Sequence, residues 1–160
     1  HRVDRRQRQM CIRDSISLDL GYLKYSYPRE AQFNQSEVYG ILSVYGVKLG
    51  AYYSDDAPGI DSQQSTLYRY LGYETRLPLE LGLQLRYGQM DFKDPRLIRA
   101  SGQGEDSYHE WEAKLTREMA GLELGLSYID TDLSRSQCTS NYGFSDLCGA
   151  TWVASIKKTF

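Results

Sequence analysis

Ser107, His109 and Glu110 are the residues whose types and spacing could support catalysis. A serine near a histidine and a carboxylate suggests a hydrolase, because histidine can accept the serine proton during nucleophilic attack. Ser107 and His109 are two positions apart, which places them on the same face of a β-strand. That face continues with Trp111 and Leu115, so it is apolar, and the sequence has no G-x-S-x-G motif. We therefore interpret His109 as an interfacial side chain, and we predict no catalytic residue and no enzyme.

Metal binding has equally little support. Asp55, Asp56 and Asp61 form an acidic group, but their spacing matches no calcium-binding loop, which favours a solvated turn. The other histidine of the chain, His1, lies in a stretch unlike the rest of the sequence. We predict no metal site and no cofactor.

Cys138 and Cys148 bracket a polar segment and form an even pair. In an oxidising location such as a cell envelope, a disulfide is expected, and a loop of this size gains roughly 3 kcal/mol in the chain-entropy model. Two free thiols or a metal pair are the alternatives. The disulfide is favoured because no histidine lies near the cysteines in the sequence.

Charged and amide side chains recur at alternate positions of the predicted strands. The members of this group are Lys48, Glu80, Gln84, Arg86, Glu110, Glu112, Lys114 and Glu123. One interpretation is a pore lining whose mixed charges select solutes. The other, equally supported, is a closed lumen filled by a salt-bridged network, as in small barrels.

The stretch Leu79–Tyr87 shows which element positions these side chains. Leucine or tyrosine occupies every odd position, while glutamate, glycine, glutamine and arginine occupy the even positions. This period of two predicts a strand with one apolar and one polar face, whereas a helix would wrap the leucines around its circumference. Nine such residues, when tilted, are about enough to cross a hydrocarbon layer.

The same alternation recurs along the chain and predicts about eight strands. We place them near residues 15–27, 36–45, 47–53, 65–75, 79–87, 107–117, 122–131 and 150–160. Their connections are alternately long and short, with long ones at 29–35, 54–64, 91–105 and 132–149. This rhythm predicts an all-β, antiparallel up-and-down meander that forms a partial outer-membrane β-barrel. A soluble β-sandwich is the alternative.

Aromatic residues on the apolar faces fall into two groups. Tyr87, Trp111, Tyr128 and Trp152 lie near one end of their predicted strands, and Tyr73 and Phe160 lie near the other. Two belts of this kind are typical of membrane interfaces. The terminal Phe160 also resembles the C-terminal signal that the barrel-assembly machinery reads. We therefore expect outer-membrane lipid and that machinery as partners.

Composition agrees with this interpretation. The 160 residues are enough for one domain, and the net charge of −2 gives no support for a nucleic-acid-binding surface. No apolar run is long enough for a transmembrane helix. The mean hydropathy of −0.56 is compatible with a barrel, because only alternate strand residues face lipid.

Residues 1–14 differ from the rest of the chain. They are basic, lack periodicity and have no apolar core of a signal peptide. The string from Met10 to Ser15 resembles a translated adapter used in sequencing libraries. We therefore interpret 1–14, including Cys11, as a non-native or disordered leader, and 15–160 as the barrel domain.

Several tyrosine-rich motifs resemble the Gcw_chp family of uncharacterised bacterial outer-membrane proteins. The motifs are Leu20–Pro28, Ser36–Tyr39, Ala51–Ser54, Ser127–Ser134 and Ser155–Phe160. Members of the family are longer and carry a signal peptide, so the resemblance implies the C-terminal part, about two thirds, of such a barrel. It implies the outer membrane of a Gram-negative bacterium and transfers no catalytic residue.

The function expected from the sequence is that of a porin-like passive channel for small hydrophilic solutes. A structural or surface-interaction barrel with a plugged lumen is the alternative. A lipid-modifying enzyme is the third and weakest hypothesis.

Overall fold

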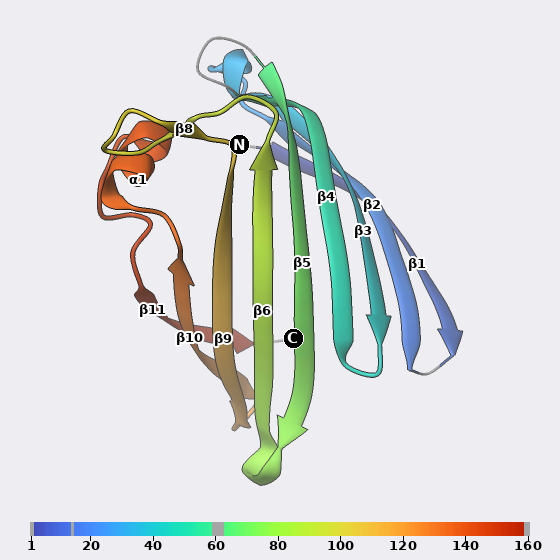
Figure 1. Ribbon diagram of the computed structural model, residues 1–160. Coiled ribbons are helices and arrows are strands. Elements are labelled where there is room, and N and C mark those ends of the chain that lie inside the picture. The colour runs from blue at the N-terminus through green and yellow to red at the C-terminus, as the bar shows by residue number, and fades with distance from the viewer. Residues whose placement is uncertain (1, 14, 59–62, 159–160) are drawn as a thin grey trace.

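The computed structural model describes the backbone of residues 2–13, 15–58 and 63–158 (Figure 1). One antiparallel sheet contains nine strands in the order β1-β2-β3-β4-β5-β6-β9-β10-β11. The strands are β1 (Arg2–Arg13), β2 (Ile16–Ser26), β3 (Gln35–Val44), β4 (Val47–Pro58), β5 (Gln63–Leu77), β6 (Leu81–Phe92), β9 (Ser107–Met119), β10 (Leu122–Thr131) and β11 (Thr151–Lys158). The all-β meander is thus confirmed, with eight long strands from Ile16 onward.

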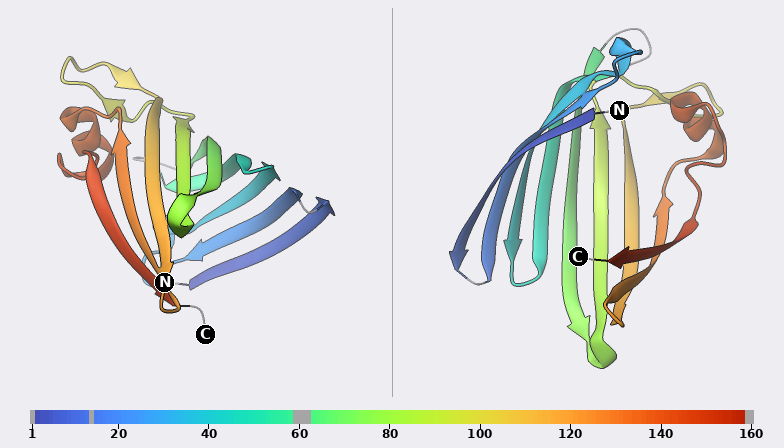
Figure 2. Two further views of the ribbon diagram at one scale, coloured as in Figure 1. Left: turned by 90° about the horizontal axis from the view of Figure 1, so that it is seen from below. Right: turned by 180° about the vertical axis from the view of Figure 1, so that it is seen from behind.

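The sheet is curved but open. Figure 2 shows the strands following a curved surface from the β1 edge to the β11 edge. Within the described residues, β1 and β11 pair only with β2 and β10, so the sheet does not close into a barrel. Strand β1 lies in the segment that we interpret from sequence as a leader, and that interpretation stays a prediction.

Tight turns join the strands at the end that we call the turn end. Tyr45 and Gly46 have φ values of 48° and 87°, and Ala120 and Gly121 have φ values of 52° and 75°. Two consecutive positive φ angles define the type I′ turn, whose twist matches that of a hairpin.

The predicted start of the strand at Leu79 is wrong by two residues. Pro78–Glu80 form a short 3-10 turn, in which Leu79 and Glu80 have positive φ angles of 66° and 60°. Pro78 fixes its own φ and cannot donate a ladder hydrogen bond, so it begins the turn and β6 starts at Leu81. Glu80 therefore lies in the turn and not on the polar face of a strand.

The predicted loop 54–64 is also shorter than expected. Residues up to Pro58 continue β4 and pair with the first residues of β5, after a register shift between Ser54 and Ala57. The extra residues in this shift let β4 bend without ending the ladder. Asp61 lies outside the described residues.

The two faces of the sheet have different side chains. The outer face carries leucines that pair across strands, such as Leu49 with Leu71, and both are more than half exposed at 52% and 54%. The inner face carries the tyrosines and charges of alternate positions, and there Tyr39 is only 5% exposed. The concave side of a curved sheet crowds its side chains, which accounts for the lower exposed fraction on the inner face.

Two long connections fold into a small structure at the other end of the strands, which we call the cap. It comprises residues 93–106 and 132–149, with β7 (Leu97–Ile98), β8 (Gly104–Glu105) and α1 (Arg135–Tyr142). Leu97 is fully buried there against Phe92 and Tyr108. Among the described residues α1, with eight residues, is the longest helix, and none of their helices has the length and apolar character to span a bilayer.

Candidate functional site

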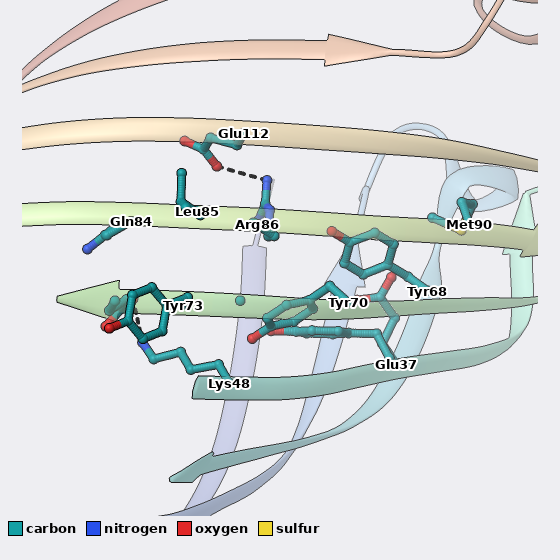
Figure 3. A pocket seen from close by; sticks show the side chains of 13 residues that line it. Glu37, Lys48, Tyr68, Tyr70, Tyr73, Gln84, Leu85, Arg86, Met90 and Glu112 are labelled. Atoms are coloured by element: carbon teal, nitrogen blue, oxygen red, sulfur yellow. Dashed lines mark hydrogen bonds and ion pairs between the residues drawn. The ribbon is translucent and has the colours of Figure 1, made fainter. Parts of the chain in front are cut away.

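A polar hollow of about 390 Å³ lies on the inner face near the middle of the sheet (Figure 3). Strands β3, β4, β5, β6 and β9 contribute its walls. Antiparallel pairing brings alternate residues of five neighbouring strands to one face, so residues far apart in sequence meet here.

Four tyrosines form a row of rings across the inner face. The ring centroids of Tyr39 and Tyr52 are 5.2 Å apart, and those of Tyr52 and Tyr68 are 6.1 Å apart. Tyr70 follows at 5.9 Å from Tyr68, with an angle of 29° between the ring planes. Contacts at these distances fall within the range of favourable aromatic pairs. We call these four residues the tyrosine row.

Glycines on neighbouring strands make room for this row. A Cβ atom placed on Gly50 would lie 2.0 Å from the ring of Tyr70, and one on Gly21 would lie 2.4 Å from the ring of Tyr39. Each glycine stands directly opposite its tyrosine in the ladder. The rings therefore lie flat against the sheet, with one face on the backbone of the neighbouring strand.

Ion pairs fix the charged side chains of the hollow. Lys48 Nζ lies 2.6 Å from Glu74 Oε1, and Arg86 Nη2 lies 3.0 Å from Glu112 Oε2. Arg86 and Glu112 are direct cross-strand partners, the arrangement in which opposite charges attract best on a sheet. Glu110 lies 3.5 Å from the same guanidinium and accepts a 2.6 Å hydrogen bond from the Tyr68 hydroxyl.

The predicted pore-lining group is largely brought together. The inner face of the strands carries Lys48, Gln84, Arg86, Glu110, Glu112, Lys114 and Glu123. Glu80 is the exception, because its turn places it at the turn end, where it lines a second hollow together with Glu123. The tyrosine row was not predicted from the sequence, although the glycines opposite the tyrosines can be recognised once the strand register is known.

His109 lies on the outer face and is held by the cap. Its main-chain N–H donates to Asp132 Oδ1 at 2.8 Å, and its ring Nδ1 lies 2.9 Å from Asp132 Oδ2. Its ring also stacks on Tyr87 with centroids 5.6 Å apart. Within the described residues, Ser107 has no side-chain hydrogen bond to His109. The partner Asp132 was not foreseen from the sequence.

The aromatic residues predicted as belts lie on the outer face. Tyr87 pairs with Trp111, and Tyr128 pairs with Trp152, whose ring centroid is 5.1 Å away. Tyr73 lies toward the turn end of β5. The outer-face aromatic residues near the cap also include Tyr22 and Tyr53, which were not predicted as belt residues from the sequence. Phe160 lies outside the described residues.

Cys138 and Cys148 are joined by a disulfide within the cap, with their Cα atoms 5.9 Å apart. The bond links α1 to the segment that leads into β11, and Cys138 is fully buried. Ser140 connects the helix to the hairpin, because its Oγ accepts from the N–H of Ile98 at 2.9 Å and donates to the Arg96 carbonyl at 3.1 Å.

Asp56 serves as a clamp near the cap end of β3 and β4. Its carboxylate accepts from the N–H of Ser36 at 2.7 Å, from the Ser36 hydroxyl at 2.8 Å and from the Ser54 hydroxyl at 3.0 Å. Burial alone would raise the pKa of Asp56, but these hydrogen bonds outweigh burial and lower it. The described residues contain no group of three or more ligands that could hold a metal ion.

A family model described as a bacterial protein of unknown function (Gcw_chp) matches residues 7–160. Neither the curated proteins nor the solved structures gave a match to the chain.

Proposed function

The chain belongs to the Gcw_chp family, a bacterial family of unknown function, and from that premise we propose that its sheet is part of the wall of an outer-membrane channel. The outer face of the sheet meets lipid in this proposal. The inner face lines a passive path for small hydrophilic solutes across the outer membrane of a Gram-negative bacterium.

The observation that carries the proposal is the continuous apolar outer face. Leucine, valine, isoleucine and aromatic side chains cover it from β2 to β11, and Leu49, Leu71 and Ile156 are 52%, 54% and 74% exposed. A soluble monomer rarely exposes an apolar patch of this extent. The buried cluster of Phe92, Leu97 and Tyr108 packs on the inner face instead, so it covers none of the outer leucines.

The distribution of aromatic and charged residues on the outer face gives further support. Between the outer-face aromatic residues near the cap and Tyr73 near the turn end, the outer face is almost wholly apolar. Charged residues occur again on the cap side of these aromatic residues, where Arg69 Nη2 lies 3.2 Å from Asp91 Oδ2. Amphipathic aromatic rings between an apolar band and a charged band are typical of a membrane interface.

The inner face supports a path for polar solutes. Its ion pairs and hydroxyl groups give a wall that water can wet, whereas the outer face offers few polar atoms. Because the sheet is open, we propose that further strands complete the barrel. Recognition of Phe160 by the assembly machinery belongs to the same proposal.

The test is the conductance, in planar lipid bilayers, of the full-length protein that includes the strands completing the barrel. Discrete current steps in potassium chloride are expected, with a reversal potential that Glu112→Lys shifts toward anion selectivity because it reverses a charge of the wall. Leu115→Ile on the outer face is the control and keeps the original selectivity. Current no greater than that of the bare bilayer would contradict the channel.

A second candidate is a surface-interaction barrel with a plugged lumen. The crowding of the inner face favours it, since Tyr39 is only 5% exposed and the cap packs on Phe92 and Tyr108 at one end. This function predicts insertion into lipid without current. A variant that lacks residues 93–106 would then gain conductance if the cap is the plug, and it would stay silent if the inner face itself fills the lumen.

A further inference from the structure

We propose that the hollow on the inner face is a binding subsite for an uncharged, polyhydroxylated solute such as a saccharide unit. The ring of Tyr70 is the platform on which the sugar ring rests. This inference rests on the proposed channel function, because it names the class of solute that the channel wall recognises.

The orientation of Tyr70 is the first support. Its ring lies flat over Gly50, so one face is in contact with the sheet and the opposite face is turned toward the hollow (Figure 3). Tyr68 lies beside it at 5.9 Å and extends the platform along β5. An aromatic face is apolar and electron-rich, and it packs well against the C–H groups on one side of a sugar ring.

The rim of the hollow supplies hydrogen-bonding groups at the edge of this platform. Within the described residues, the carboxamide of Gln84 has no hydrogen-bond partner and is exposed to the hollow. Glu74 and Glu112 each bind a cation through one carboxylate oxygen, and the second oxygen has no partner among the described residues. Hydroxyl groups of a sugar can donate to these oxygens and to Gln84.

The charges of the hollow favour an uncharged solute. Lys48 and Arg86 are its cations, and each is already paired with a glutamate at 2.6 and 3.0 Å. An anionic solute would have to displace these glutamates, and a cationic solute would have to compete with the two bound side chains or, at Glu37, with the hydrogen bond that Gln35 Nε2 donates to that carboxylate at 2.8 Å. A neutral polyol leaves both pairs intact and uses only the free oxygens and the ring face.

The experiment is calorimetric titration of the detergent-folded protein with maltotriose as the uncharged probe and choline chloride as the cationic probe. Binding of maltotriose and none of choline is expected. Tyr70→Ala should lower the association constant about fivefold or more, in line with the worth of an aromatic contact, while Tyr70→Phe should keep it within about twofold because the ring remains. Tyr87→Ala on the outer face is the matched control and should bind like the parent.

Several results would overturn the inference. These are choline binding in place of maltotriose, no binding of either probe, or equal losses in Tyr70→Ala and Tyr70→Phe. If Tyr70→Ala does not fold, Gln84→Ala takes its place, because this side chain makes no contact that the fold needs, and unchanged maltotriose binding would then contradict the proposal.

Bilayer conductance separates this inference from the proposed function. Titration does not require a conducting pore, so maltotriose binding without current would contradict the channel alone. Current without maltotriose binding would contradict the subsite alone.

Discussion

At the scale of single residues, the pairing of glycine with tyrosine organises the inner face. Tyrosine needs space to lie flat on a sheet, and only a residue without a Cβ leaves that space on the neighbouring strand. Gly50 and Gly21 provide it for Tyr70 and Tyr39. Gly88 provides it for Tyr68, whose hydroxyl would lie 2.5 Å from a Cβ at that position. These glycines are therefore required by close approach and not by an unusual φ angle.

Replacing Gly50 with alanine should destabilise the protein by about 1–3 kcal/mol, the usual cost of overpacking. The new methyl group would overlap the Tyr70 ring, which is flanked by Tyr68 and cannot shift freely. Gly72→Ala is the matched control, because its nearest neighbour would lie 3.4 Å away in ordinary contact. Urea unfolding in lipid vesicles measures both variants, and equal midpoints would contradict the close-approach argument.

Acid should weaken the clamp made by Asp56, which lies on the cap side of the outer-face aromatic residues. The hydrogen bonds from Ser36 and Ser54 lower the folded-state pKa of Asp56, although burial opposes them. A lowered pKa gives stability that is present above the unfolded-state pKa and is lost as pH falls through the folded-state pKa. We therefore expect a loss confined to pH values below the ordinary carboxyl range.

The variant Asp56→Asn tests this expectation. It should cost about 1–2 kcal/mol at neutral pH, through weaker hydrogen bonds to Ser36 and Ser54. It should also remove the loss of stability that protonation of Asp56 causes at acidic pH. Asp55→Asn is the control, because Asp55 is exposed. Unfolding midpoints from neutral to acidic pH give the comparison, and parallel curves for the parent and Asp56→Asn would refute the clamp.

Most inward side chains could be predicted from the sequence, because alternation assigns a face without knowledge of the partner strand. Contacts that depend on register could not. Tyrosine occurs on both faces, so Tyr39 and Tyr70 look like Tyr53 and Tyr87 until the ladder shows which stand opposite glycine. The pairing of His109 with Asp132 depends on where the cap folds, which no local pattern encodes.

At the scale of elements, the cap is the clearest departure from a simple loop. Ser134 is the N-cap of α1, and its side chain accepts from the Gln137 N–H while the Gln137 side chain accepts from the Ser134 N–H. Gly143 ends the helix in the left-handed conformation. These start and stop signals are present in the sequence, but the helix is short and its burial comes from the β7–β8 hairpin.

The disulfide of the cap gives an element-scale prediction. In a Cys11→Ser background, non-reducing mass spectrometry should show Cys138 and Cys148 protected from alkylation until a reductant is added. Reduction should destabilise the cap by roughly 3 kcal/mol through the loss of chain constraint, and proteolysis within 132–149 should increase. A Cys138→Ser, Cys148→Ser double variant is the control and should not respond to reductant. Two thiols that react before reduction would contradict the bond.

At the scale of the whole molecule, the rhythm of long and short connections predicted the meander because each tight turn forces adjacent strands to pair. The prediction failed in detail at Leu79, where Pro78 moved the turn by two residues, and at 54–64, where the strands continued through a bulge. Closure could not be predicted, since it depends on strand number and stagger, which alternation does not specify.

A charge on the outer face should prevent insertion into lipid. Leu49 lies between Leu42 and Leu71 near the middle of the apolar face, so Leu49→Arg should cost about 2–4 kcal/mol of folding into vesicles. Ser155→Arg on the inner face is the control, because the new side chain would point away from lipid, and it should fold like the parent. Refolding yield in vesicles measures the difference. Equal yields for the two variants would remove the main support for a membrane location.

Both tryptophans of the chain, Trp111 and Trp152, lie on the outer face. The intrinsic emission of the protein is therefore a built-in reporter of what surrounds the sheet, unaffected by events in the hollow on the opposite side. Brominated acyl chains should dim this emission on reconstitution, without any attached dye. The same signal would let the orientation and depth of the sheet be followed in real time as the protein assembles.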